Sequence, residues 1–221
     1  MSEQMAAESS SGMDRSYPAD HRRRQVMRRF AFLIVIMLTA LRPACADCVA
    51  RSNASTAHLI ELYTSEGCSS CPPAERWLGG LRENPNVVAL EFHIDYWDSL
   101  GWRDRFADPR YTARQHALAT RGGSGIVYTP EVALDGREWR DWYRGSQPPS
   151  AAAAPFALEL RVKAANPLTV SLDVESASGT DPSAYRSYFA ITEDGLSSDV
   201  KAGENRGAIL RHYHEIGRAH V

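Results

Sequence analysis

The segment from His58 to Ile94 constrains the fold more than any other part of this sequence, because a Cys-x-x-Cys pair lies between a strand pattern and a helix pattern. The string HLIELYT at 58–64 predicts a strand that runs almost directly into Cys68. The string VVALEFHI at 87–94 predicts a second strand. Between them, a helical stripe at i, i+3, i+4 and i+7 is formed by Ala74, Trp77, Leu78 and Leu81. We therefore expect a right-handed βαβ unit, with parallel strands and the cysteines at the C-terminal end of the first strand.

The residues after this unit predict a second helix and a hairpin. Asp108 suits the N-cap position and Pro109 the first helical position, so the helix is expected to run to about Arg121. Further along, Asp135 and Gly136 stand between two apolar runs, and this dipeptide is typical of a two-residue β-hairpin turn.

The pattern changes again after a linker-like stretch at 147–155. Apolar residues alternate over 156–162 and 168–174, and 185–191 forms another candidate strand. We expect a smaller, β-rich C-terminal region over 156–214, and we find no catalytic constellation within it. With 221 residues, 43% of them hydrophobic, the chain is long enough for one domain and such an addition.

The N-terminus has the pattern of a secretory signal. Arginines cluster at 22–29, an apolar run interrupted only by Thr39 follows at 30–41, and Ala-Cys-Ala occupies 44–46. The apolar run is shorter than the ~20 residues that span a bilayer. We expect residues 1–46 to be an extension and signal peptide that is cleaved, leaving a periplasmic or secreted chain with no stable membrane span.

The sequences at both ends of the chain have alternative interpretations. A single membrane anchor would need a longer apolar run, and a lipoprotein cysteine at Cys45 would prefer an apolar residue in place of Arg42. A start at Met27 would give a compact signal. At the other end, residues 215–221 resemble the translation of a common sequencing adapter, so the chain is expected to be truncated after His214.

Charge and cysteine content narrow the classes of function. Lys and Arg total 25 against 27 Asp and Glu, so the chain lacks the basic surplus that phosphate-dominated nucleic-acid binding requires. The four cysteines stand at Cys45, Cys48, Cys68 and Cys71, and cleavage of the signal would leave only the last two as a close pair. In an oxidising compartment such a pair is either a structural disulfide or a redox centre.

The order of predicted elements looks like the thioredoxin fold. More narrowly, the strings ELYTSEGCSSCPPAERWL, FHIDYWDSLGWRDRFADPRYTARQ and VYTPEVALDG resemble a bacterial family of exported thioredoxin-like proteins known as domain of unknown function 1223. The resemblance is close over 57–145, the expected thioredoxin-like domain, and looser beyond it, including Gly-Glu-Asn-Arg-Gly at 203–207. Two features depart from the pattern. No proline separates the two cysteines, and a Pro/Ala-rich stretch follows Gly145 where a helix is expected.

The fold class implied is α/β, with a thioredoxin-like domain followed by the β-rich region. The resemblance also implies that Pro130 follows a cis bond beside the cysteines and that the backbone of Thr129 is presented to an incoming polypeptide.

A thiol at the start of a helix has a lowered pKa, because the helix dipole and unpaired N–H groups stabilise the thiolate. We assign Cys68, expected on the exposed side, as nucleophile and Cys71 as the resolving thiol. The sequence thus predicts an exported thiol–disulfide oxidoreductase that acts on protein thiols or disulfides and needs no cofactor.

Other polar and aromatic residues have competing interpretations. Glu61 or Asp95 is a candidate acceptor for the proton of Cys71, although a carboxylate in a strand is more often an edge residue. His93 is more typical of a core histidine than of a ligand. Three aromatic residues either line a substrate groove or pack in the core: Tyr96, Trp97 and Trp102.

Two other functions stay open. A copper or zinc site would use Cys68 and Cys71 with His93 and Asp95 as further ligands, although one C-x-x-C is only half of a tetrahedral site. A non-catalytic exported interaction module would keep the pair as a permanent disulfide.

Overall fold

The computed structural model describes residues 48–163, 167–177 and 179–216, and it has a mixed α/β architecture. The predicted signal region, 1–46, and the cleavage site after it lie outside the described residues, as do 217–221. Within the described ranges, neither α-helix has the length and apolar character needed to cross a bilayer.

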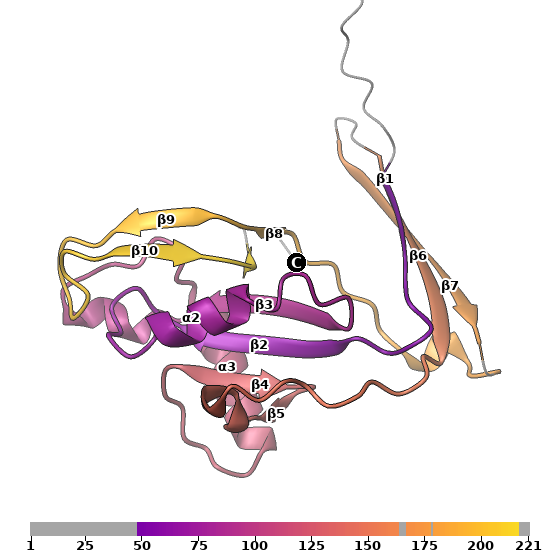
Figure 1. Ribbon diagram of the computed structural model, residues 1–221, viewed down its shortest axis with the longest axis horizontal. Coiled ribbons are helices and arrows are strands. Elements are labelled where there is room, and N and C mark those ends of the chain that lie inside the picture. The colour runs from indigo at the N-terminus through magenta and orange to yellow at the C-terminus, as the bar shows by residue number, and fades with distance from the viewer. Residues whose placement is uncertain (1–47, 164–166, 178, 217–221) are drawn as a thin grey trace, which may run out of the picture. The chain divides into compact units, whose positions relative to one another are not determined.

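The main sheet contains six strands among the described residues and is built around the predicted βαβ unit (Figure 1). In sheet order the strands are β5 (Arg137–Glu138), β4 (Glu131–Leu134), β2 (His58–Thr64), β3 (Val87–His93), β11 (Glu215–Ile216) and β8 (Thr192–Glu193). As predicted, β2 and β3 are parallel, with His58 opposite Val87. Strand β4 pairs antiparallel with β2, and β11 adds to β3 in parallel.

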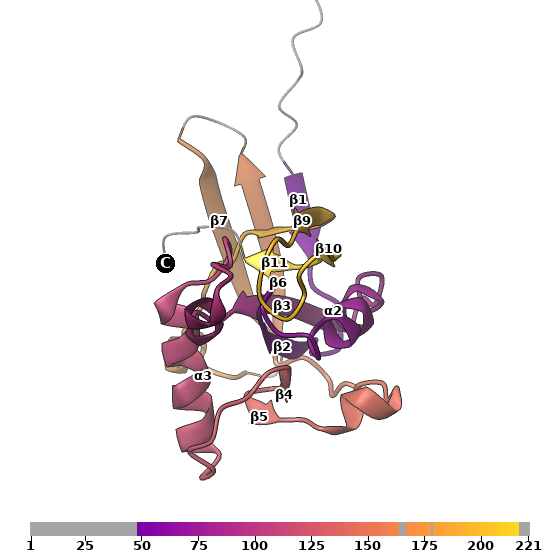
Figure 2. The same cartoon turned by 90° about the vertical axis from the view of Figure 1, so that its left-hand side faces the viewer.

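Two helices cover opposite faces of this sheet, as Figure 2 shows for α2 (Pro72–Gly79) and α3 (Pro109–Arg121). Strand residues alternate between the faces, so Ile60 and Leu62 pack under α2, while Tyr63 and Phe92 pack under α3. By the same alternation, the even positions of β2 and the odd positions of β3 share the α2 face. The α2 face of the sheet therefore receives Thr64 from β2 together with Glu91 and His93 from β3.

The local signals for α3 and the hairpin are confirmed. The Asp108 carboxylate accepts a hydrogen bond of 2.8 Å from the backbone N–H of Arg110 and caps α3. At the β4–β5 turn, Asp135 and Gly136 have φ values of 51° and 76°, the left-handed conformation that such a turn requires.

The C-terminal region is β-rich, as expected, but its strands join three sheets. Strand β6 (Phe156–Lys163) pairs with β7 (Thr169–Ser176) and with β1 (Cys48–Arg51), which the sequence did not predict. Strand β9 (Leu196–Asp199) pairs with β10 (Ile209–His212), and β10 contacts α2. Strands β8 and β11 extend the main sheet, so this region helps to build the domain that carries the cysteines.

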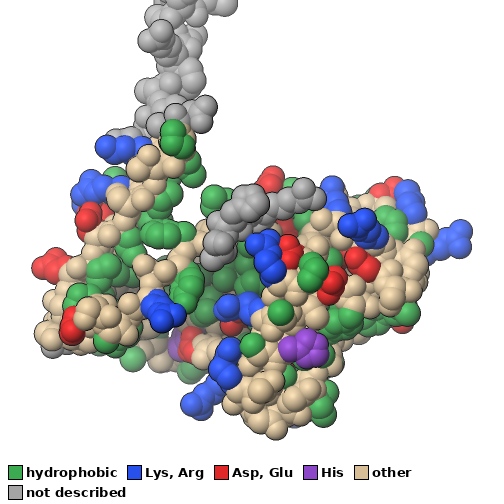
Figure 3. All heavy atoms as spheres, turned by 180° about the vertical axis from the view of Figure 1, so that it is seen from behind, with side chains coloured by type: hydrophobic (Ala, Val, Ile, Leu, Met, Phe, Trp, Pro, Cys, Tyr) green, Lys and Arg blue, Asp and Glu red, His purple; other side chains and the backbone are tan. Residues whose placement is uncertain are grey.

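The strand predicted over 185–191 is wrong. These residues have no strand conformation, and several of their apolar side chains are exposed: Tyr185, Tyr188, Phe189 and Ile191. An alternating pattern gives a strand only where a neighbouring strand supplies backbone partners, and no ladder reaches this segment. Hydrophobic side chains lie among basic and acidic ones on the surface shown in Figure 3.

Three short 3₁₀ helices complete the described structure: η1 (Tyr96–Leu100), η2 (Asp141–Arg144) and η3 (Pro182–Ala184).

Candidate redox site

The two cysteines lie between the end of β2 and the start of α2, where the sequence placed them. Cys68 and Cys71 form a disulfide with an S–S distance of 2.18 Å and a Cα–Cα distance of 5.5 Å. Cys71 is the N-cap residue of α2, and its backbone N–H donates to the carbonyl of Cys68 at 3.2 Å. The hydroxyl of Ser70 lies 3.3 Å from the Cys68 sulfur. The pair therefore closes a tight turn at the N-terminal end of a helix.

The expected exposure of Cys68 is wrong, because both cysteines are fully buried. A loop from the C-terminal region, Gly203 to Gly207, lies over the turn. The side-chain amide of Asn205 donates to the carbonyls of Glu66 and Cys68, at 2.9 and 2.8 Å. The Glu204 carboxylate accepts from the backbone N–H and the hydroxyl of Ser69, at 3.0 and 2.7 Å. This loop, which we call the covering loop, brings contacts to the cysteine turn from a region where the sequence showed no catalytic constellation.

Close packing holds the covering loop against the cysteine turn. Gly203 has a φ of 72°, and a Cβ added there would lie 3.2 Å from the Cβ of Trp102 and 3.7 Å from the Cα of Gly67. Both the left-handed backbone and the lack of space favour glycine at this position.

The Thr129–Pro130 peptide bond is cis, as the resemblance implied. The indole N–H of Trp97 donates to the hydroxyl of Thr129 at 2.8 Å, and the Cβ of Trp97 packs near Gly67, beside Cys68. Trp97 thus connects the cysteine turn with the Thr129 segment. Next to it is an open cavity of about 460 Å³, which is lined by Tyr128, Thr129, Pro130, Arg140, Trp142 and Tyr143.

Both candidate proton acceptors have other partners. Glu61 is buried on the α3 face and forms an ion pair of 2.6 Å with Arg114. Asp95 accepts a hydrogen bond of 2.5 Å from the Thr112 hydroxyl. The described contacts therefore bring neither carboxylate to Cys71.

The other two aromatic candidates are also anchored by hydrogen bonds. The indole N–H of Trp102 donates to Glu66 at 2.6 Å, and the hydroxyl of Tyr96 donates to Gln115 at 3.4 Å.

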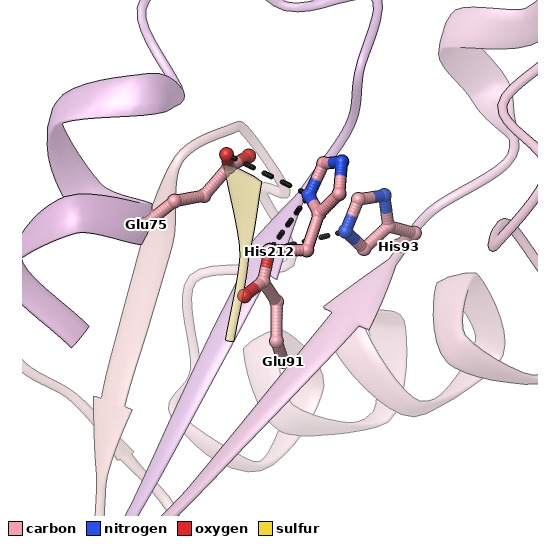
Figure 4. Close-up of side chains that lie close together, drawn as sticks. All are labelled: Glu75, Glu91, His93 and His212. Carbon is pink, nitrogen blue, oxygen red and sulfur yellow. Dashed lines mark hydrogen bonds and ion pairs between the residues drawn. The ribbon is translucent and has the colours of Figure 1, made fainter. Parts of the chain in front are cut away.

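A second group of polar residues lies on the α2 face of the sheet, and Figure 4 shows its four central members. Glu91 and His93 project from β3, Glu75 from α2 and His212 from β10, and all four are buried. One ligating atom from each lies within 4.8 Å of the others. We call these residues the Glu/His cluster.

Burial and mutual charge shift the pKa values of the cluster. Burial and the nearby Glu91 carboxylate raise the pKa of Glu75 to about 7. Burial alone would lower the pKa of His212, but Glu66 and Glu91 raise it to about 9. Burial likewise opposes ionisation of His93, but the facing carboxylates, including Glu215 and Asp104, raise its pKa well above the usual value. The raised pKa values of His93 and His212 favour their protonated forms, which face the surrounding carboxylates.

The sequence favoured a core histidine at His93, and the residue is indeed fully buried, with Asp104 and Glu215 as partners. The other members of the cluster were missed. One signal was available: Glu91 and His93 stand at i and i+2 in an otherwise apolar strand, so both point to the same buried face. Glu75 falls three residues before Leu78 and shares its helix face, yet it has the appearance of a surface residue of a short helix. His212 has no local signal, because it reaches the group only through tertiary packing of β10 on α2.

Comparison with known proteins places the chain in a family. One solved structure is similar, that of a protein from Agrobacterium tumefaciens, with 23% identity, 75% of this chain and 72% of the other covered, and a TM-score of 0.47. The comparison with curated proteins gives no match. Residues 59–220 match the family model described as protein of unknown function DUF1223. The chain therefore belongs to the DUF1223 family, as the sequence motifs indicated.

Proposed function

We propose that this protein is an exported thiol–disulfide oxidoreductase with a thioredoxin-like domain, in which Cys68 and Cys71 are the redox pair. The observation that carries the proposal is the position of the disulfide, at the N-terminal end of α2 directly after the central strand β2. A thiolate there is stabilised by the positive end of the helix dipole. The order of β2, α2, β3, α3 and the β4–β5 hairpin supports the proposed architecture.

The proposed reaction is two successive thiol–disulfide exchanges. The Cys68 thiolate attacks one sulfur of a substrate disulfide, that S–S bond breaks, and the other substrate sulfur leaves as a thiolate. Cys71 then loses its proton and attacks the Cys68 sulfur, which releases the second substrate thiolate. The substrate disulfide gains two electrons and the cysteine pair loses two, giving the disulfide form of the structure. In the reverse direction the pair oxidises a substrate dithiol.

The substrate polypeptide would reach the pair from the side of Thr129 and the adjoining cavity. The side-chain hydroxyl of Thr129 accepts a hydrogen bond from Trp97, which also packs beside the cysteine turn. Because Cys68 is covered, exchange requires the covering loop to open and break the contacts of Glu204 and Asn205. The hydrogen bonds of that loop are then expected to control the rate of exchange.

Burial of both sulfurs specifically favours a second candidate, a non-catalytic exported module with a permanent disulfide. A clip that closes a loop of so few residues removes little chain entropy from the unfolded state. Its contribution to stability would therefore be small, and its loss would affect the melting temperature only modestly.

Trapping of substrates separates the two candidates. In a Cys48→Ser background, Cys71→Ser leaves the Cys68 nucleophile without its resolving thiol. With a disulfide-containing substrate such as native insulin, we expect covalent adducts that disappear on addition of dithiothreitol. Cys68→Ser in the same background should form none of these adducts and should abolish turnover.

The Cys48→Ser background itself serves as the control, since its redox pair is intact and its exchange should match that of the unchanged chain. If neither single variant traps a substrate and both only lower the melting temperature, the disulfide is structural and the proposal fails.

A further inference from the structure

The Glu/His cluster is assembled from three elements, of which β10 is distant in sequence from the other two. Glu75 lies on α2, Glu91 and His93 on β3, and His212 on β10. All are at most 1% exposed, so no water layer screens their charges. Figure 4 shows the side chains pointing towards a common centre. Two carboxylates and two imidazoles arranged in this way are donors typical of a divalent transition-metal site.

The spacing of the ligating atoms fits a single ion. His93 Nε2 lies 3.1 Å from Glu91 Oε1, and His212 Nδ1 lies 3.8 Å from both Glu91 Oε1 and Glu75 Oε2. Metal–ligand distances of about 2.0–2.1 Å in a tetrahedral zinc site imply ligand–ligand distances of about 3.3 Å. The four ligating atoms lie within 4.8 Å of one another, so movements of up to about 1.5 Å by the His212 ring and the Glu75 carboxylate would complete such a site.

Carboxylates outside the cluster orient its two histidines, as residues behind metal ligands usually do. His93 presents Nε2 to the cluster, while its Nδ1 lies 2.6 Å from Asp104 Oδ2. His212 presents Nδ1, while its Nε2 faces Glu66 Oε1 at 3.4 Å. A carboxylate behind the distal ring nitrogen fixes the tautomer and orientation of a metal-binding histidine.

The Glu75 carboxylate is oriented in a similar way. Its Oε1 accepts a hydrogen bond of 2.7 Å from the Thr64 hydroxyl, which leaves Oε2 directed at the cluster.

His212 is fully buried but has only long contacts with its carboxylate neighbours. Its Nδ1 lies 3.8 Å from Glu75 and Glu91, and its Nε2 lies 3.4 Å from Glu66. Neither ring nitrogen makes a regular hydrogen bond with the described residues. Buried polar atoms without a hydrogen bond are rare, and a bound ion is one explanation for them. A metal ion bound by the cluster would give Nδ1 of His212 the close partner that it lacks among the described residues.

We propose that Glu75, Glu91, His93 and His212 form a binding site for one divalent transition-metal ion, with zinc the best match to two nitrogen and two oxygen donors. Two carboxylates neutralise the dication, so the loaded four-residue site has no net charge. The site shares His93 with the metal site considered at the cysteine pair, but it contains no sulfur and does not include Asp95.

Glu215 is a further oxygen donor at the edge of the site. Its Oε2 lies 3.0 Å from His93 Nε2, and it is buried beside Glu91 on β11. The four-residue set is complete without this side chain. Removal of Glu215 by Glu215→Gln is therefore expected to weaken binding less than removal of a histidine.

Zinc binding to the purified full chain tests the proposal directly. The chain is stripped with a chelator, loaded with zinc chloride and desalted, and bound zinc is measured by mass spectrometry of the metal. We expect one zinc ion per chain, and a rise in melting temperature of about 5–10 °C at zinc concentrations about 100 times the Kd. With cobalt, the visible d–d bands should appear without the near-ultraviolet charge-transfer band of a thiolate ligand.

Variants identify the ligands. His212→Gln and Glu75→Gln should each lose stoichiometric zinc and the thermal shift, whereas His116→Gln, which changes an exposed histidine of α3, should keep both. The Cys68→Ser/Cys71→Ser double variant should bind zinc normally. Circular dichroism of each variant establishes that it is folded. Because Glu75→Gln preserves the size of the side chain, it remains informative even if His212→Gln does not fold.

Two results would overturn the proposal. One is a folded parent chain that binds no zinc or cobalt at stoichiometric level. The other is metal binding that survives in folded Glu75→Gln but is lost in the double cysteine variant, which would assign the metal to the cysteines.

Discussion

Replacing Asn205 by alanine should make the Cys68–Cys71 disulfide more accessible to reductants. The side chain donates two hydrogen bonds, to the carbonyls of Glu66 and Cys68, and thereby holds the covering loop on the cysteine turn. At about 0.5–1.5 kcal/mol for each bond, their loss favours the open loop by about 1–3 kcal/mol. The population of the open form, and with it the rate of reduction, should rise about 5- to 150-fold.

The assay is the rate of disulfide reduction by dithiothreitol, followed by rapid alkylation and mass spectrometry. Asn53→Ala is the matched control, because the Asn53 amide also donates to a backbone carbonyl, that of Pro85, at an exposed site. Reduction through local opening should depend little on urea well below the unfolding transition. If Asn205→Ala is reduced no faster than Asn53→Ala, the loop does not control access to the pair.

Two further predictions concern the helices. A Cβ at Gly79 would lie 2.7 Å from the ring of Tyr213, so Gly79→Ala should destabilise the fold by about 1–3 kcal/mol in urea unfolding, whereas Gly122→Ala, with ordinary contacts, should have little effect. The hydrogen bond from Arg110 lowers the pKa of the N-cap Asp108 in the folded chain. The contribution of the ionised Asp108 carboxylate to the free energy of unfolding is therefore present above the unfolded pKa of about 3.9. It is lost as the pH falls through the lower folded pKa. Asp108→Ala should cost about 1 kcal/mol at pH 7, and this difference should shrink below pH 4; a constant difference would contradict this assignment.

Local sequence signals predicted the elements next to the cysteines. Hydrophobic periodicity placed β2, α2 and β3, and the Asp-Pro and Asp-Gly pairs placed the start of α3 and the β4–β5 turn. These signals succeed because capping, turn conformation and burial of one face depend on residues that are close in sequence. The spacing of Cys68 and Cys71 already permits a disulfide within one turn.

The parts that could not be predicted depend on contacts between distant segments. The burial of Cys68 arises from the covering loop, more than 130 residues further along the chain, as the separation of 137 residues between Asn205 and Cys68 shows. The Glu/His cluster likewise depends on His212, whose strand β10 reaches α2 only in the folded chain. The Pro/Ala-rich residues after η2 gave no indication that the chain returns to complete the main sheet. The proposed adapter origin of 215–221 stays a prediction.

The reduction potential of the Cys68–Cys71 pair tests the central claim most directly. The Cys48→Ser protein is equilibrated in glutathione or dithiothreitol redox buffers, and the fractions of thiol and disulfide are measured after alkylation. For a pair that exchanges with protein substrates, we predict a potential between about −120 and −270 mV, the range of known thiol–disulfide oxidoreductases. A potential below about −300 mV, together with resistance to reduction, would identify a structural disulfide and contradict the proposed function.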